Sequence, residues 1–215
     1  MNTKKAFDFE SVNDFDRHIA LSIPNYGGLC DIFRAISLED LHPQGRFIDI
    51  GCSTGSFIDS MPKPENVEFI GVDLADIRNN NSGFTFIKQE ASEYLKGIQS
   101  ADVIVLMFTL QFAGKHNRNK IIDELVRINK NGATILIAEK VYIDNSKLNQ
   151  TLHREHIRTK RRSFTDSEIL EKDYQLSGSM FCKTDFEMNK ELSRFGEYHQ
   201  VWQSYNFKAW CINAL

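Results

Sequence analysis

Residues 47–55 of the chain read Phe-Ile-Asp-Ile-Gly-Cys-Ser-Thr-Gly. Four residues typical of a buried strand lead directly into a short turn that is bracketed by Gly51 and Gly55. A second short strand, Glu68–Asp73, ends in an acid about twenty residues further along the chain. In nucleotide-binding folds an acid at this separation from the glycine turn accepts hydrogen bonds from the ribose hydroxyls. Glycine allows the backbone to approach a ligand where a Cβ atom would collide. The pattern predicts the floor of a nucleotide-type pocket and disfavours the alternative, a tight turn with no ligand.

The spacing of this turn indicates which ligand the pocket takes. A dinucleotide fingerprint reads G-x-G-x-x-G, whereas this chain has an acid, Asp49, followed by Gly51 and Gly55 in the order D-x-G-x-x-x-G. The pyrophosphate turn is therefore missing. This form resembles motif I of the class I S-adenosylmethionine-dependent methyltransferases, in which the glycines lie under the methionine moiety of the cofactor. The resemblance implies S-adenosylmethionine, or its carboxylated derivative, as the ligand.

Short apolar runs alternate with helical patterns along the chain. This alternation predicts an α/β domain of Rossmann-like class I methyltransferase fold, with a seven-stranded, mostly parallel sheet and a C-terminal antiparallel hairpin. We expect a single domain over 1–215, with an N-terminal helical arm at 1–40 and a helical insertion after the fifth strand at 146–182. Residues 76–83 are rich in asparagine, so the second crossover is expected to be abbreviated. The expected strands are 47–50, 68–73, 84–88, 102–108, 133–139, 198–204 and 206–213.

Composition excludes several classes of protein. A formal net charge of -3 gives no overall footprint for nucleic acid, which makes it an unlikely direct partner. No apolar run approaches the roughly 18 residues that a membrane span needs, and the first residues lack an apolar signal core, so we expect a cytoplasmic protein. The four cysteines form no C-x-x-C pair, and His153, Glu155 and His156 lack an evident third ligand, so no metal site is predicted.

Three further segments narrow the resemblance. They are Ser22-Ile23-Pro24-Asn25-Tyr26 before the first long helix, Phe108-Thr109-Leu110-Gln111-Phe112 after the fourth strand, and Glu139-Lys140 with Trp202–Phe207 near the end. Together they resemble carboxy-S-adenosylmethionine synthase, which acts in the tRNA wobble-uridine oxyacetate pathway, and the resemblance runs from about residue 7 to 212. It implies a homodimer that converts S-adenosylmethionine and prephenate into carboxy-S-adenosylmethionine and phenylpyruvate.

The resemblance also implies roles for individual residues. Tyr26 would contact the methionine end of the cofactor, Asp73 would hold the ribose and Leu74 would lie beside the adenine. The acceptor for the adenine amino group matches Glu90, which is followed by Ala91, although Ser92 fits an ungapped alignment. The full set of expected cofactor-binding residues is Tyr26, Asp49, Gly51, Cys52, Ser53, Gly55, Asp73, Leu74, Glu90, Ala91 and Met107.

Two positions depart from the family. Met107 stands where an asparagine is expected, and the carboxylate-binding arginine falls on Asp173, whose charge would repel a carboxylate. Lys172 next to it could supply a point charge without the bidentate fork of arginine. The sequence therefore favours methyl or related one-carbon transfer, with carboxy-S-adenosylmethionine synthesis as the close alternative and a non-catalytic cofactor-binding or interaction module as a third possibility.

The catalytic residues are not evident from the sequence. Methyl transfer from a sulfonium needs little acid–base help, because the donor is already activated and alignment supplies most of the catalysis. Arg154 and Arg158 are four residues apart and share one face of an expected helix, so they are candidate clamps for a small anionic substrate. A solvated basic helix face is the alternative interpretation. Tyr26 completes the list of catalytic candidates.

Overall fold

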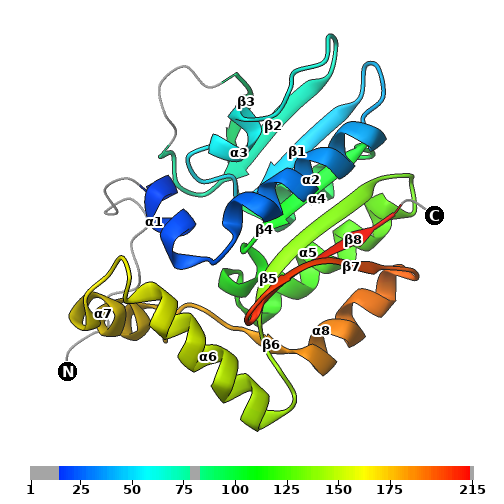
Figure 1. The fold of residues 1–215 in the computed structure, drawn as a ribbon. Helices are drawn as coiled ribbons and strands as arrows, with labels where there is room; N and C mark the ends of the chain where they lie inside the picture. The colour runs from blue at the N-terminus through cyan, green and yellow to red at the C-terminus, as the bar shows by residue number, and fades with distance from the viewer. Residues whose placement is uncertain (1–14, 78–82, 214–215) are drawn as a thin grey trace, which may run out of the picture.

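A mixed β-sheet forms the centre of the protein (Figure 1). The computed structural model describes residues 15–77 and 83–213. The strands follow the order β3-β2-β1-β4-β5-β8-β7, and a short β6 pairs with β5 off this path. The strands are β1 Arg46–Ile50, β2 Glu68–Asp73, β3 Thr85–Lys88, β4 Val103–Met107, β5 Thr134–Tyr142, β6 Lys183–Thr184, β7 His199–Ser204 and β8 Phe207–Ile212.

The pairing of the strands fixes where a ligand can enter. Strands β1 to β5 run parallel to one another in the sheet, whereas β8 runs antiparallel to its neighbours β5 and β7. The strand order reverses at β1, which lies between β2 and β4. In open α/β sheets a ligand binds in the crevice outside the carboxyl ends of the strands at such a switch point. The residues that follow β1, β2 and β4 therefore meet at one edge.

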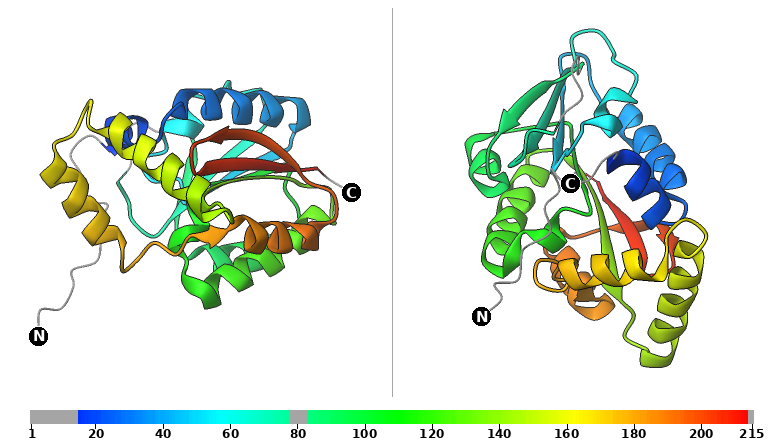
Figure 2. Two further views of the ribbon diagram at one scale, coloured as in Figure 1. Left: turned by 60° about the horizontal axis from the view of Figure 1, so that its bottom comes forward. Right: turned by 90° about the vertical axis from the view of Figure 1, so that its left-hand side faces the viewer.

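Helices cover both faces of the sheet, which gives three layers (Figure 2). One face packs against α2 and α3 through a core that includes Phe33, Phe47 and Phe57. The other face packs against α4, α5 and α8 through side chains such as Ile104, Ile121 and Leu192. The helices are α1 Phe15–Ser22, α2 Tyr26–Asp40, α3 Ser56–Asp59, α4 Ala91–Gly97, α5 Gly114–Asn129, α6 Ser146–Lys160, α7 Asp166–Leu176 and α8 Asp185–Leu192, with short 3-10 turns η2 Leu110–Phe112 and η3 Ser193–Phe195.

Helices α1, α6 and α7 gather at the edge where the central strands end (Figure 1). The carbonyl of Ser22, the last residue of α1, accepts a hydrogen bond from Nε2 of His156 on α6 at 2.8 Å, if that ring nitrogen carries the proton. The ring of His18 on α1 lies 5.2 Å from that of Phe164, which follows α6. These contacts hold the N-terminal arm and the insertion together over the carboxyl ends of the strands.

The predicted fold class is confirmed, including the antiparallel hairpin and the helical segment after β5. The sheet has eight strands rather than seven, because the two residues of β6 pair with the end of β5. Helix α8 begins directly after this short strand, at Asp185. Two residues carry too little periodicity to reveal such a strand. The described residues of the abbreviated crossover, 74–77 and 83–84, contain no helix, and residues 78–82 lie outside the described part of the chain.

No helix in the described part of the chain is long and apolar enough to span a bilayer.

Candidate functional site

A cavity of about 480 Å³ opens at the carboxyl ends of the central strands. Its volume lies within the range of small-molecule sites. Residues from β1, β2 and β4 form its floor, and residues from α1, α6 and α7 form its opposite wall. Of the expected cofactor-binding residues, the cavity is lined by Tyr26, Asp49, Gly51, Cys52, Ser53, Asp73, Leu74, Glu90, Ala91 and Met107.

The turn after β1 is held open by backbone geometry and by Asp73. Gly51 and Gly55 both have φ of 78°, a region that strongly favours glycine. The Asp73 carboxylate accepts a hydrogen bond from the Ser53 amide at 2.9 Å and another from the Ala75 amide at 3.0 Å. This acid therefore links the loop after β1 to the loop after β2. Ionised carboxylate oxygens have further lone pairs, so Asp73 can still accept ribose hydroxyls.

Protein side chains fill the space beside Gly51 and Gly55. A Cβ atom on Gly51 would collide with the side chain of Thr109, and one on Gly55 would collide with the ring of Phe84. The Thr109 hydroxyl donates to the carbonyl of Ile50 at 2.9 Å, which fixes it there. Protein side chains therefore exclude a Cβ atom at both positions, and the approach of a ligand to this backbone stays a prediction. Gly51 still lines the cavity, whereas Gly55 does not.

The loop after β1 is also tied to α1. Oδ1 of Asp16 accepts a hydrogen bond from the Thr54 hydroxyl at 2.6 Å, and Oδ2 accepts one from the Ser56 hydroxyl. Thr54 is buried and Asp16 lines the cavity. The first helix is therefore part of the pocket wall, a contact that spacing along the sequence could not reveal because it joins residues about forty positions apart.

One end of the cavity suits an adenine ring. Oε2 of Glu90 accepts hydrogen bonds from the amides of Ser92 and Glu93 and from the Ser92 hydroxyl, and this caps α4. Its Oε1 makes no hydrogen bond to the described residues, so it can accept from an exocyclic amine. Leu74 is 65% exposed at the rim, where it can cover an aromatic face. Ser92 is buried and does not line the cavity, which favours Glu90 over Ser92 as the acceptor.

The centre of the cavity holds polar groups without protein partners. Asp49 is 2% exposed and makes no hydrogen bond to the described residues. Burial, and then the charge of Asp73, raise the pKa of Asp49 to about 8. The hydroxyl of Ser53 is also buried, and it has no hydrogen-bond partner among the described residues. A buried carboxylate is stabilised by a nearby cation, so these groups fit the ammonium and sulfonium charges of S-adenosylmethionine.

Tyr26 closes the same region. It is half-buried at the start of α2 and lines the cavity. Burial raises the pKa of its phenol, and the neighbouring Cys30, Asp49 and Asp16 add to the shift. The hydroxyl is therefore neutral at physiological pH and available as a hydrogen-bond donor. Met107, at the end of β4, presents a thioether to the cavity at the position where the resemblance leads one to expect an amide.

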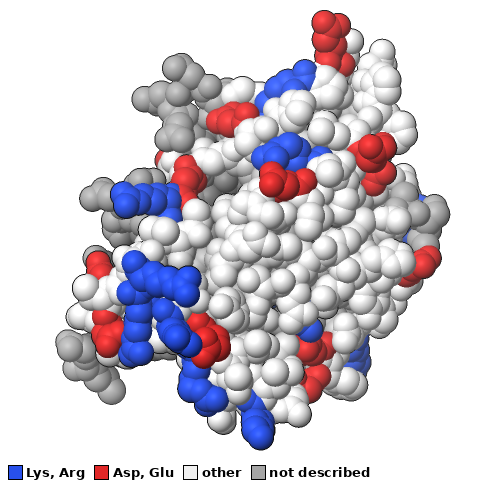
Figure 3. Space-filling view, in the orientation of Figure 1, with Lys and Arg blue, Asp and Glu red and all other residues white. Residues whose placement is uncertain are grey.

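Arg154 and Arg158 do not line the cavity, so the structure does not bring these candidate clamps together with the expected cofactor-binding residues. Arg154 is exposed and bonds Thr151, while Arg158 reaches Glu155 at 3.5 Å with 77% of its side chain exposed. Basic side chains gather over the part of the surface where α6 and α7 lie (Figure 3). The opposite face of α6 contributes His156 and Lys160 to the cavity.

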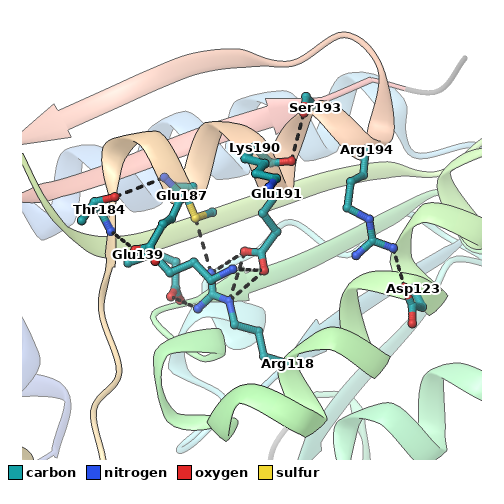
Figure 4. Close-up of polar contacts among 11 residues, drawn as sticks. Arg118, Asp123, Glu139, Thr184, Glu187, Lys190, Glu191, Ser193 and Arg194 are labelled. Carbon is teal, nitrogen blue, oxygen red and sulfur yellow. Dashed lines mark hydrogen bonds and ion pairs between the residues drawn. The ribbon is translucent and has the colours of Figure 1, made fainter. Parts of the chain in front are cut away.

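A second group of charges lines the β5 side of the cavity. It consists of Lys140 at the end of β5, Lys160 at the end of α6, and Lys172 with Asp173 on α7. The end of β5 is held by Gln111, whose Oε1 accepts the Lys140 amide at 3.0 Å. Glu139, the preceding residue, is anchored from the other face of the sheet by Arg118 at 3.0 Å (Figure 4). Lys140 therefore projects from a firmly held position.

Within 15–77 and 83–213, no group of three or more His, Cys, Asp and Glu side chains is arranged to hold a metal ion. His153 does not line the cavity, whereas His156 faces it and its Nε2 contacts the Ser22 carbonyl. The four cysteines are free thiols.

Comparison with known proteins gives a consistent family of relatives. A family described as a methyltransferase domain matches residues 48–137. The carboxy-S-adenosyl-L-methionine synthases of Idiomarina loihiensis and Nautilia profundicola are 27% and 29% identical to the chain, over 94% of its length and 90% and 91% of theirs. Among solved structures, the plantazolicin methyltransferases BamL and BpumL, each in complex with SAH, align with TM-scores of 0.61 and 0.63 at 14% identity, over 93% of this chain and 88% of theirs.

Proposed function

Because the chain is an S-adenosylmethionine-dependent transferase with the class I methyltransferase fold, we propose that it performs one-carbon chemistry of the carboxy-S-adenosylmethionine synthase type. In this reaction S-adenosylmethionine and prephenate give carboxy-S-adenosylmethionine, phenylpyruvate and water. The cofactor supplies an activated carbon next to its sulfonium. The protein binds and aligns the two reactants.

One observation carries the proposal. A single cavity joins the residues that fit the cofactor, from Glu90 to Tyr26, with the basic residues of β5, α6 and α7. An adenosine group between Leu74 and Glu90, with its ribose at Asp73, directs the methionine end toward Asp49 and Tyr26. The remaining space lies over β4 and β5, and the chain lines it with Lys140 and Lys160. A small anion bound there would lie beside the reacting end of the cofactor, and such proximity is the main source of catalysis in transfers of this kind.

A second candidate is ordinary methyl transfer to a small anionic acceptor. Asp173 favours it, because this acid lines the cavity at the position that resembles the carboxylate-binding arginine of the synthases. Met107 favours it as well, since a thioether is a weak hydrogen-bond acceptor and no donor. Under this alternative the same residues bind the cofactor, and only the acceptor of the transferred group differs.

The test is to incubate the protein with S-adenosylmethionine and prephenate and to analyse the nucleotide by mass spectrometry. The proposal expects a product heavier by one carboxyl group, formed together with phenylpyruvate. Demethylated nucleotide without this product would instead support methyl transfer. A protein that binds the cofactor by calorimetry but turns over neither substrate would be a binding module. Failure to bind S-adenosylmethionine, its demethylated product or its carboxylated form would contradict all three.

We also propose that the protein is a homodimer that serves tRNA modification, as the resemblance implies, and that it is cytoplasmic, as expected from the sequence. Exposed large apolar side chains on or near α6 and α7 support a contact surface there, namely Leu148, Leu170, Tyr174 and Phe181. Light scattering coupled to size-exclusion chromatography measures the mass directly. A monomeric mass at micromolar concentration would contradict the dimer.

A further inference from the structure

Helix α1 covers part of the cavity with little packing of its own. None of its eight described residues is buried, yet five of them line the cavity, namely Phe15, Asp16, His18, Ile19 and Ser22. Ile19 packs against one of the two core clusters, and the two ends of the helix are held by hydrogen bonds of Asp16 and of the Ser22 carbonyl. A helix that is held by so few contacts opens at a lower free energy than a buried one.

Asp16 fastens α1 to the loop after β1. Its Oδ1 accepts a hydrogen bond from the Thr54 hydroxyl at 2.6 Å, and its Oδ2 accepts one from the Ser56 hydroxyl. The two hydroxyl oxygens are 3.0 Å apart, so the three side chains form one cluster. Hydrogen bonds to a carboxylate are stronger than those between neutral groups. This cluster therefore sets how firmly α1 is closed over the floor of the cavity.

Asp16 also adds a carboxylate to the acidic half of the cavity. Asp49, Asp73 and Glu90 line this half at the ends of β1, β2 and β3, whereas the lysines among the described lining residues lie on β5, α6 and α7. Asp49 is 2% exposed and makes no hydrogen bond to the described residues, so this half holds a buried carboxylate that a cation would stabilise. Burial raises the pKa of the Tyr26 phenol, and the charges of Asp49 and Asp16 add to the shift, which places both acids near this side chain.

S-adenosylmethionine differs in net charge from the nucleotides that it gives rise to. Its sulfonium and ammonium outweigh its single carboxylate, so the cofactor carries one net positive charge. Transfer of the methyl group to an acceptor leaves a neutral thioether, and addition of a carboxylate cancels the positive charge. Either nucleotide product is therefore without net charge. The acidic half of the cavity distinguishes the cofactor from both products by coulombic attraction.

We propose that Asp16 is a specificity-determining residue that keeps α1 closed over S-adenosylmethionine in preference to nucleotides without its net positive charge. The inference rests on the proposed function, because it concerns the release of the nucleotide product from the same site. A ligand shifts the equilibrium between the closed and open positions of α1 only by its different interaction with the two. The bound cation attracts Asp16 and so stabilises the closed position. Once that charge is lost, Asp16 and Asp49 repel each other and α1 opens.

The first test compares the affinities of three nucleotides by isothermal titration calorimetry. They are S-adenosylmethionine, S-adenosylhomocysteine and sinefungin, an analogue that carries an amine in place of the charged methylsulfonium group. The unsubstituted protein should bind the two cationic nucleotides about three- to tenfold more tightly than S-adenosylhomocysteine. In Asp16→Asn this preference should shrink by about threefold or more, because the charge is removed and the size of the side chain is kept. Glu65→Gln, which changes an exposed acid outside the cavity, should leave the preference unchanged.

The second test separates the hydrogen bonds of Asp16 from its charge. Thr54→Val removes one hydroxyl donor and changes no charge. It should raise the dissociation rates of all three nucleotides several-fold, measured by surface plasmon resonance, and leave the preference for the cationic ones as it is. The matched control is Thr151→Val, which changes an exposed threonine on α6 and should leave the rates unchanged.

The outcomes separate this inference from the proposed function. An equal preference in Asp16→Asn and the unsubstituted protein would overturn the role of the Asp16 charge, and unchanged dissociation rates in Thr54→Val would overturn the closure of α1 by this cluster. If the unsubstituted protein binds S-adenosylmethionine and S-adenosylhomocysteine equally well, the inference fails while the proposed cofactor chemistry stands, and this comparison needs no variant. If it binds none of the three nucleotides, the proposed function fails first.

Discussion

Arg118 and Lys160 are both buried cations, and their surroundings differ completely. Arg118 is 4% exposed and Lys160 is 8% exposed. The Arg118 guanidinium donates to Glu139 at 3.0 Å and to Glu191 at 2.7 Å, and Glu191 also accepts Lys183 at 2.5 Å (Figure 4). Lys160 has no such partner among the described residues. The charge of Arg118 is therefore balanced by the protein itself, whereas that of Lys160 is not balanced by the described residues.

The protonation equilibria express the same difference. Burial opposes the charge of Arg118, but the carboxylates of Glu139 and Glu191 outweigh it and raise the pKa of the guanidinium. Burial lowers the pKa of Lys160, and the coulombic pull of Asp173 does not restore it. The paired charge of Arg118 joins β5, α5 and α8 into one unit. The buried charge of Lys160, which has no such pairing, marks a place where a ligand can bind.

The largest expected effect on the free energy of unfolding comes from removing Arg118 from its ion pairs. Arg118→Met leaves Glu139 and Glu191 buried without their main partner, and it should lower the free energy of unfolding by about 3–5 kcal/mol. Urea denaturation measures this loss. Arg158→Met, which removes an exposed arginine, should change the same quantity by less than about 0.5 kcal/mol. Equal effects from the two variants would mean that the network does not stabilise the fold.

The second effect concerns the anionic side of the cavity. Asp73 has backbone partners and still lines the cavity, so it combines a structural and a ligand-binding role. Asp73→Ala should weaken binding of S-adenosylmethionine by about 1–3 kcal/mol, since charged hydrogen bonds to the ribose are lost. Calorimetry gives the affinity directly. Unchanged affinity would place the ribose elsewhere, while Asp59→Ala, outside the cavity, serves as the control.

The third effect is that of Lys160→Met on the free energy of unfolding, and it should not be the loss expected for Arg118→Met. Lys160→Met replaces an ammonium that has no ion-pair partner in the described part of the chain with an apolar side chain of similar length. It should leave the free energy of unfolding unchanged or raise it by about 1 kcal/mol, because a desolvation penalty is removed. Urea denaturation in the absence of ligand is the measurement. A clear loss of stability would show that Lys160 is paired within the fold, like Arg118.

The smallest expected effect is a pH dependence of cofactor affinity that arises from Asp49, the acidic counterpart of Lys160. Its pKa of about 8 in the folded protein lies above the ordinary value of about 3.9 in an unfolded chain. Between these values the folded state binds more protons, so Asp49 lowers stability as pH rises from about 4 to 8. A cationic cofactor favours the ionised carboxylate, and its affinity should therefore rise several-fold from pH 6 to 8.

The control for this effect is Asp49→Asn, which carries no titrating group. Its cofactor affinity should be nearly flat over the same pH range. The groups that face Asp49 are the carboxylate of Asp73 and the phenol of Tyr26, whose pKa is raised by burial. An identical pH profile in the variant would assign the dependence to another group.

Much of the cofactor end could be predicted from the sequence. The glycine turn, Asp73 and Glu90 lie directly after strands, and the carboxyl ends of parallel strands must meet at one edge of a sheet. The predicted use of S-adenosylmethionine agrees with the methyltransferase domain match over residues 48–137. The specific contacts of each residue with the cofactor remain predictions.

The other end of the cavity was harder to predict. Arg154 and Arg158 share a face of α6, but spacing alone does not say whether that face meets the protein or the solvent. On the other side of α6, Leu152, His156 and Lys160 follow one another at intervals of four residues. The apolar Leu152 was the sequence feature that could have indicated that this side faces the protein. A lysine at the end of a basic helix is usually solvated, so its burial could not be inferred from composition.

The sequence by itself determined the order of strands and helices, the turn after β1 and the acids that follow β2 and β3. These depend on periodicity and on chemistry within a few residues of each other. Only the tertiary structure decided that Lys140 and Lys160 face one cavity without ion-pair partners among the described residues, and that Arg118 is paired with the buried carboxylates of Glu139 and Glu191. The free energy of a buried charge depends on neighbours brought from distant parts of the chain, and those neighbours are set by packing.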